Sequence, residues 1–129
     1  VYAVERNEDA QALILENRRK FGLHNLTLIA GAAPETLAGL PAPDRVFVGG
    51  TGGHMAETLA AVRAANPAAR VVISAIAIES LSAALAALQA QGFENIQVSQ
   101  ISVSRSRPAG GLHLMMAQNP VYLISGGAL

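Results

Sequence analysis

Short apolar runs alternate with amphipathic helical patterns along the chain of 129 residues. Apolar runs that suit β-strands occupy residues 1–5, 26–30, 45–48 and 71–76. Between several of these runs, apolar residues recur every three or four positions, which is typical of helices packed on a sheet. The alternation predicts one α/β domain over residues 1–129 with a largely parallel sheet.

The first helix is marked by both of its ends. Asn7 is expected to cap its N-terminus, acidic residues follow in the first turn, and Gly22 follows a basic last turn. This charge order complements the helix dipole, and glycine suits the left-handed cap. The residues expected to face the sheet are Ala10, Leu13, Ile14, Asn17 and Phe21.

Further helices are expected later in the chain. A short helix is predicted over 34–40, and a second over 55–65 that ends before Asn66-Pro67. A third begins near Ile78 and ends before Gly92, and its apolar face comprises Ile78, Leu81, Leu85 and Leu88. We expect these leucines to be buried, so Leu85→Ala should cost about 2–5 kcal/mol.

The tail of the chain has strand patterns without a helix between them. They cover residues 96–103, 112–116 and 121–125, so antiparallel pairing is expected. Gly110 and Gly111 favour a turn that places Arg105 and Arg107 on a hairpin.

Composition excludes several classes of protein. The absence of cysteine excludes a disulfide scaffold, a cysteine nucleophile and thiolate zinc. Nine basic and nine acidic residues argue against a general nucleic-acid binder. No apolar run reaches the roughly 20 residues of a membrane helix. We therefore expect a soluble, cytoplasmic protein without nucleic-acid or membrane partners. His24, His54 and His113 are too scattered to predict a metal site.

Three features have candidate chemistry. Glu5 ends a strand at the sheet edge where cofactors bind, and its carboxylate suits ribose hydroxyls, although a solvated charge is an equally simple interpretation. The glycine-rich segment 49–53 follows a buried strand, and its backbone N–H groups near a helix N-terminus suit carboxylates; a loop without function is the alternative. Arg105 and Arg107 suit bidentate binding of carboxylates, or are simply solvated.

Four segments carry a resemblance to a known family. They are VYAVERN at 1–7, GAAPE at 31–35, DRVFVGGTGG at 44–53 and QNPV at 118–121. Together they resemble the decarboxylating precorrin methyltransferases of cobalamin biosynthesis, which are S-adenosylmethionine-dependent. The resemblance covers essentially the whole chain. It implies a Rossmann-like methyltransferase fold, mostly parallel, with a C-terminal antiparallel hairpin.

The resemblance also implies a reaction. The expected activity is methyl transfer from S-adenosyl-L-methionine to carbon 15 of a precorrin, with decarboxylation of the acetate on carbon 12. Family members are homotetramers, so a homo-oligomer is expected. They open with a strand and a G-x-G-x-G turn that nothing before Val1 supplies, so we expect an N-terminally truncated domain. A methyltransferase for another small molecule, a nicotinamide-binding module and an inactive fragment with an assembly role are the alternatives.

The resemblance assigns residues to two ligands but no catalytic acid or base. The expected cofactor-binding residues are Glu5, Arg6, Gly31, Ala32, Ala33 and Gly49. The expected substrate-binding residues are Gly50, Thr51, Gly52, Gly53, His54, Arg105 and Arg107. Most relatives carry Asp or Glu where Ala32 stands, so one hydrogen bond to the adenine is expected to be missing here. Alignment of donor and acceptor can drive methyl transfer without a strong base.

Overall fold

The computed structural model describes residues 1–128, which fall into two compact units. The first unit is Val1–Ala42 and the second begins at Pro43. Each unit has its own sheet and at least one helix.

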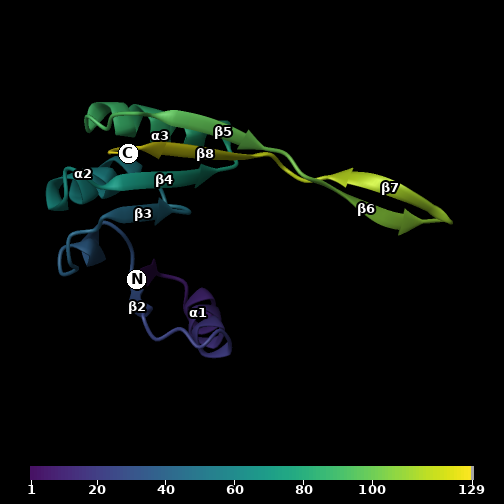
Figure 1. Ribbon diagram of the computed structural model, residues 1–129, viewed down its shortest axis with the longest axis horizontal. Coiled ribbons are helices and arrows are strands. Elements are labelled where there is room, and N and C mark those ends of the chain that lie inside the picture. The colour runs from purple at the N-terminus through teal and green to yellow at the C-terminus, as the bar shows by residue number, and fades with distance from the viewer. Residues whose placement is uncertain (129) are drawn as a thin grey trace. The chain divides into compact units, whose positions relative to one another are not determined.

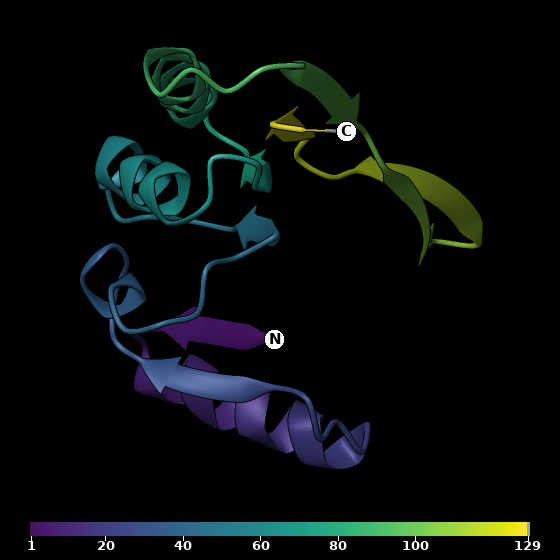
Figure 2. The same cartoon turned by 60° about the vertical axis from the view of Figure 1, so that its left-hand side comes forward.

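The first unit is a β-α-β element followed by a short turn of helix. β1 (Tyr2–Glu5) and β2 (Thr27–Ala30) are parallel, with Tyr2 opposite Thr27 and Glu5 opposite Ala30. α1 (Glu8–Lys20) connects them and runs along the two strands (Figure 2). This connection brings the carboxyl ends of both strands to one edge.

The ends of α1 confirm the sequence prediction. The Asn7 side chain accepts a hydrogen bond from the N–H of Ala10 at 2.9 Å. Gly22 has the positive φ of 60° that a left-handed helix cap requires. Both caps depend only on neighbouring residues, so the ends of α1 can be predicted from the sequence without the tertiary structure.

The predicted inward face of α1 is partly wrong. Leu13 is 59% exposed, Phe21 is 74% exposed, and Asn17 is exposed too, while Ala10 and Ile14 are half-buried. Within its unit, α1 packs on only two strands, a sheet about 10 Å wide. Side chains at the margins of its apolar stripe therefore extend past that sheet.

The predicted helix over 34–40 is also shorter than expected. Only Glu35–Leu37 (η1) is helical, as a single 3-10 turn. Seven residues are too few for a self-supporting α-helix, and Gly39 and Pro41 both disfavour its continuation.

The second unit is a four-stranded sheet with two helices. Its elements are β3 (Arg45–Val48), α2 (Met55–Ala65), β4 (Arg70–Ala75), α3 (Ile78–Ala90), β5 (Gln97–Ile101) and β8 (Val121–Gly126). The strand order is β3-β4-β8-β5, with β3 and β4 parallel and β8 antiparallel to both of its neighbours. α2 and α3 cover one face of this sheet (Figure 2).

The hydrophobic core of residues 1–128 lies in the second unit. It comprises Val48, Leu59, Val62, Ala69, Val71, Ile73, Ala75, Ala84, Ala87, Leu88, Phe93 and Ile124. The face predicted for α3 needs correction, because Ile78 is 72% exposed and Leu81 and Leu85 are only half-buried. Ile78 lies in the first turn, just after β4 ends, so it is at the edge of the sheet and not over its face.

A long hairpin confirms the predicted antiparallel tail. β6 (Ser104–Ala109) and β7 (Leu112–Ala117) pair across a turn at Gly110 and Gly111, both of which have positive φ. The hairpin continues β5 and β8 beyond the four-stranded sheet as a ribbon of two strands (Figure 1). Every residue of β6 and β7 is exposed. Of the helices within residues 1–128, none combines the length and the apolar character needed to cross a membrane.

Candidate functional site

In the first unit, the predicted cofactor residues meet where β1 and β2 end. Glu5 lies opposite Ala30, and the N–H of Gly31 donates to the carbonyl oxygen of Glu5 at 3.0 Å. Ala32 and Ala33 follow in the same turn, while Arg6 is exposed beside Glu5. The structure therefore brings Glu5 and the 31–33 turn together, as the parallel pairing of the strands predicts.

The Glu5 carboxylate is held in place from one side. The N–H of Asn7 donates to Oε1 of Glu5 at 2.8 Å, and the side chain is half-buried. Oε2 accepts no hydrogen bond from any residue in 1–128. A carboxylate can accept about four hydrogen bonds, so this group keeps the capacity to bind the two hydroxyls of a ribose.

The turn at Gly31 requires glycine. Its φ is 140°, and a Cβ there would clash with Cγ2 of Thr36. The Thr36 hydroxyl donates to the Ala32 carbonyl at 2.9 Å, which fixes the turn from the other side. The N–H groups of Ala32 and Ala33 donate to no acceptor within residues 1–128, so both can serve a ligand.

In the second unit, the predicted substrate residues 50–54 form one loop between β3 and α2, together with Gly49, which is predicted to bind the cofactor. Gly52 and Gly53 have φ values of 60° and 100°, which side chains rarely tolerate. His54 occupies the N-cap position of α2, but its side chain caps no backbone N–H. The first N–H groups of α2 are therefore available to an anion at the end of this loop.

Arg105 and Arg107 lie on one face of the hairpin. Arg105 is opposite Met116 and Arg107 is opposite Leu114, so cationic and apolar side chains alternate across that face. β6 and β7 contact chiefly each other. The joint action of the two arginines with the glycine loop stays a prediction.

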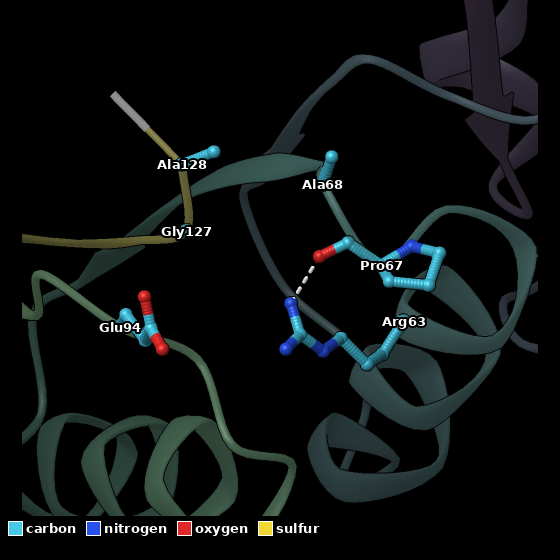
Figure 3. Close-up of a pocket in the computed structure, with 6 residues that line it drawn as sticks. All are labelled: Arg63, Pro67, Ala68, Glu94, Gly127 and Ala128. Atoms are coloured by element: carbon cyan, nitrogen blue, oxygen red, sulfur yellow. Dashed lines mark hydrogen bonds between the residues drawn. The ribbon is translucent and has the colours of Figure 1, made fainter.

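A hollow of about 320 Å³ lies at the opposite edge of the second sheet, where β4 begins and β8 ends (Figure 3). Arg63 spans it: its guanidinium donates to the carbonyls of Pro67 and Gly92 and lies 5.2 Å from the centre of the Phe93 ring. These contacts tie the end of α2 to two loops. Ligands of open α/β sheets bind at the carboxyl ends of the strands, so we assign this hollow a structural role.

Some contributors to the site had no clear signal in the sequence. The sequence predicts Asn7 as a helix cap, but it does not predict that the N–H of Asn7 also donates to the Glu5 carboxylate. Gln11 and Thr36 donate to the carbonyls of Glu5 and Ala32, and nothing in the residue pattern marks either contact. Within residues 1–128, no group of three or more His, Asp or Glu side chains is placed to hold a metal ion.

A β-α-β element with a carboxylate at the end of its first strand and a glycine turn after its second is typical of one class: the Rossmann-like domains that bind nucleotide cofactors. Comparison with known proteins narrows the class to one family. The chain belongs to the precorrin methyltransferases, because the model of the precorrin methyltransferase domain matches residues 1–126. This confirms the resemblance drawn from the four sequence segments.

The chain is also similar to a curated protein whose name describes a precorrin methyltransferase. A probable cobalt-precorrin-6B C(15)-methyltransferase (decarboxylating) from Pyrobaculum calidifontis is 40% identical over 129 residues, which cover 99% of this chain and 66% of the relative. The chain thus spans just under two thirds of the length of that relative.

Solved structures confirm the fold. Precorrin 8W decarboxylase from Methanobacterium thermoautotrophicum matches with a TM-score of 0.90 and 34% identity, covering 99% of this chain and 69% of that one. Precorrin-6y C5,15-methyltransferase from Geobacter metallireducens matches with a TM-score of 0.89 and 33% identity, covering 99% and 66%. The predicted Rossmann-like methyltransferase fold is therefore confirmed.

Proposed function

We propose that this chain takes part in S-adenosylmethionine-dependent methylation of a precorrin at carbon 15, coupled to decarboxylation of the acetate on carbon 12. The observation that carries the proposal is the set of unused acceptors and donors at the ends of β1 and β2, found in a chain of the precorrin methyltransferase family. The names of the relatives, which include C(15)-methyltransferase (decarboxylating), support the reaction.

The residues of the first unit fit an adenosyl group. Glu5 would accept from the ribose hydroxyls, and the free N–H groups of Ala32 and Ala33 would donate to the edge of the adenine. Arg6 would lie beside the ribose. When bound, S-adenosylmethionine supplies an electrophilic methyl group; the residues named here bind and orient it.

Residues of the second unit fit an anionic substrate. Precorrins carry several acetate and propionate groups, which suit the N–H groups of Gly50, Thr51, Gly52 and Gly53. His54, Arg105 and Arg107 would bind further carboxylates. Because the chain has no net charge, a polyanion would be held by these placed groups and not attracted by the whole surface.

Replacing Arg107 by alanine tests the substrate assignment. We expect weaker binding of a stable polycarboxylated tetrapyrrole and unchanged binding of S-adenosylhomocysteine, both measured by calorimetry. Glu5→Gln should weaken binding of S-adenosylhomocysteine and leave binding of the tetrapyrrole unchanged. Arg19→Ala removes an exposed arginine from α1 and serves as the matched control, with neither affinity changed. Equal effects of Arg107→Ala on both ligands would contradict the assignment.

We also propose that the chain forms a homo-oligomer, in keeping with the tetramers of its family. The hairpin supports this proposal, because Leu112 and Met115 are each 67% exposed and an isolated ribbon of two strands is marginally stable in water. Light scattering should give a mass above that of one chain, and Met115→Glu should lower it. A wild-type mass equal to a single chain would contradict the proposal.

We further propose a cytoplasmic location without nucleic-acid or membrane partners. The equal numbers of acidic and basic residues support the absence of nucleic-acid partners. Binding to a DNA duplex at physiological salt would contradict the absence of nucleic-acid partners. Binding to anionic vesicles would contradict the absence of membrane partners.

A further inference from the structure

The carbonyl oxygen of Glu5 is a junction between three elements of the first unit. Gln11, in the first half of α1, donates from Nε2 to this oxygen at 2.8 Å, in a part-buried hydrogen bond. The N–H of Gly31, at the end of β2, donates to the same oxygen at 3.0 Å. One acceptor thus connects α1 with the ends of β1 and β2.

This junction controls the backbone that carries the Glu5 carboxylate. A peptide whose carbonyl is held by two donors has little freedom to rotate, so the backbone that leads from Glu5 to Asn7 is fixed in direction. The N–H of Asn7 in turn holds Oε1 of Glu5 at 2.8 Å, while its side chain caps α1. Gln11 and Asn7 therefore hold Glu5 from its main chain and from its side chain.

We propose that Gln11 is a positioning residue for recognition of the ribose by Glu5. The proposal rests on the proposed binding of an adenosyl cofactor. Gln11 acts without touching the ligand: its amide N–H keeps the Glu5 peptide, and through it the carboxylate, in the orientation that a pair of vicinal hydroxyls requires. A glutamine that only braced α1 would affect stability and leave this selectivity unchanged.

The test compares two ligands on the full chain. S-adenosylhomocysteine and its 2′-deoxy analogue differ by one hydroxyl, so the ratio of their dissociation constants reports on Glu5. Gln11→Met keeps the length of the side chain and removes the donor; we expect it to reduce this ratio about three- to tenfold. Gln11→Lys restores an N–H donor and should recover most of the ratio. Gln89→Met, at an exposed site on α3, is the matched control and should not change it.

A double-mutant cycle separates positioning from general stability. In a Glu5→Ala background the ratio should be near one, and adding Gln11→Met should change it no further. A wild-type chain that prefers the ribose ligand, combined with an unchanged ratio in Gln11→Met, would overturn the role of Gln11 and leave the proposed function intact. A wild-type chain that binds neither ligand, or binds both equally, would overturn both.

Discussion

At the scale of single residues, Thr58 departs from the rule that buried polar groups are paired. Its side chain is 3% exposed, and its hydroxyl oxygen has no hydrogen-bond partner among residues 1–128. An unpaired buried hydroxyl costs about 1–3 kcal/mol. We expect Thr58→Val, which replaces the hydroxyl by a methyl of similar size, to raise the free energy of unfolding by about 1 kcal/mol or more. Urea unfolding with an unchanged slope would measure this gain.

A second variant at Thr58 controls for packing. Thr58→Ser keeps the hydroxyl and removes the methyl, so it should lower the free energy of unfolding. A lower unfolding midpoint for Thr58→Val would contradict the prediction, because it would show that the hydroxyl has a partner in solution.

A substitution at Ala32 tests the affinity for the cofactor and not the stability of the fold. Ala32 is half-buried in the turn that follows β2, and it has no side-chain group that could accept a hydrogen bond. We expect Ala32→Asp to add a hydrogen bond to the adenine amino group and to tighten binding of S-adenosylhomocysteine up to about tenfold, as one hydrogen bond of about 0.5–1.5 kcal/mol allows. Calorimetry would measure it, with Ala38→Asp, at an exposed site, as the control. An unchanged affinity would argue against contact between this turn and the adenine.

At the scale of elements, α3 shows which leucine supports the second unit. Leu88 is fully buried, whereas Leu85 is half-buried. Leu88→Ala should therefore cost about 2–5 kcal/mol, since it leaves a cavity. Leu85→Ala should cost about 1–2 kcal/mol, because part of its side chain already faces water. Urea unfolding of the two variants checks the order. A larger loss for Leu85→Ala would show that α3 packs on a different face.

The elements also show how far the sequence leads. The helix ends at Asn7, Gly22 and Gly92 were predictable, because capping depends on neighbouring residues. The meeting of Glu5 with Gly31 followed from parallel pairing. The exposure of Leu13 was not predictable, because burial depends on which elements pack over α1. The contact from Gln11 to the Glu5 carbonyl depends on a side-chain rotamer and has no periodic signal.

At the scale of the whole molecule, buried surface is distributed unequally between the two units. None of residues 1–42, all of which the structure describes, is buried. The core positions run from Val48 to Ile124 in the second unit. Local opening of the first unit therefore exposes little additional apolar surface, and its free energy of opening should be the smaller one.

Hydrogen exchange tests this difference directly. We expect the amides of β1 and β2 to exchange faster than those of β4 and β8, which contain the buried and directly paired Ile73 and Ile124. Leu88→Ala should accelerate exchange in the second unit, including β4 and β8, and leave β1 and β2 unchanged, since distant sites act independently. Saturating S-adenosylhomocysteine should slow exchange at Asn7 and Gly31, because a ligand that binds only the closed state stabilises it by mass action. Equal protection of β2 and β4 in the free chain would contradict the prediction and would mean that residues 1–42 open only together with the core.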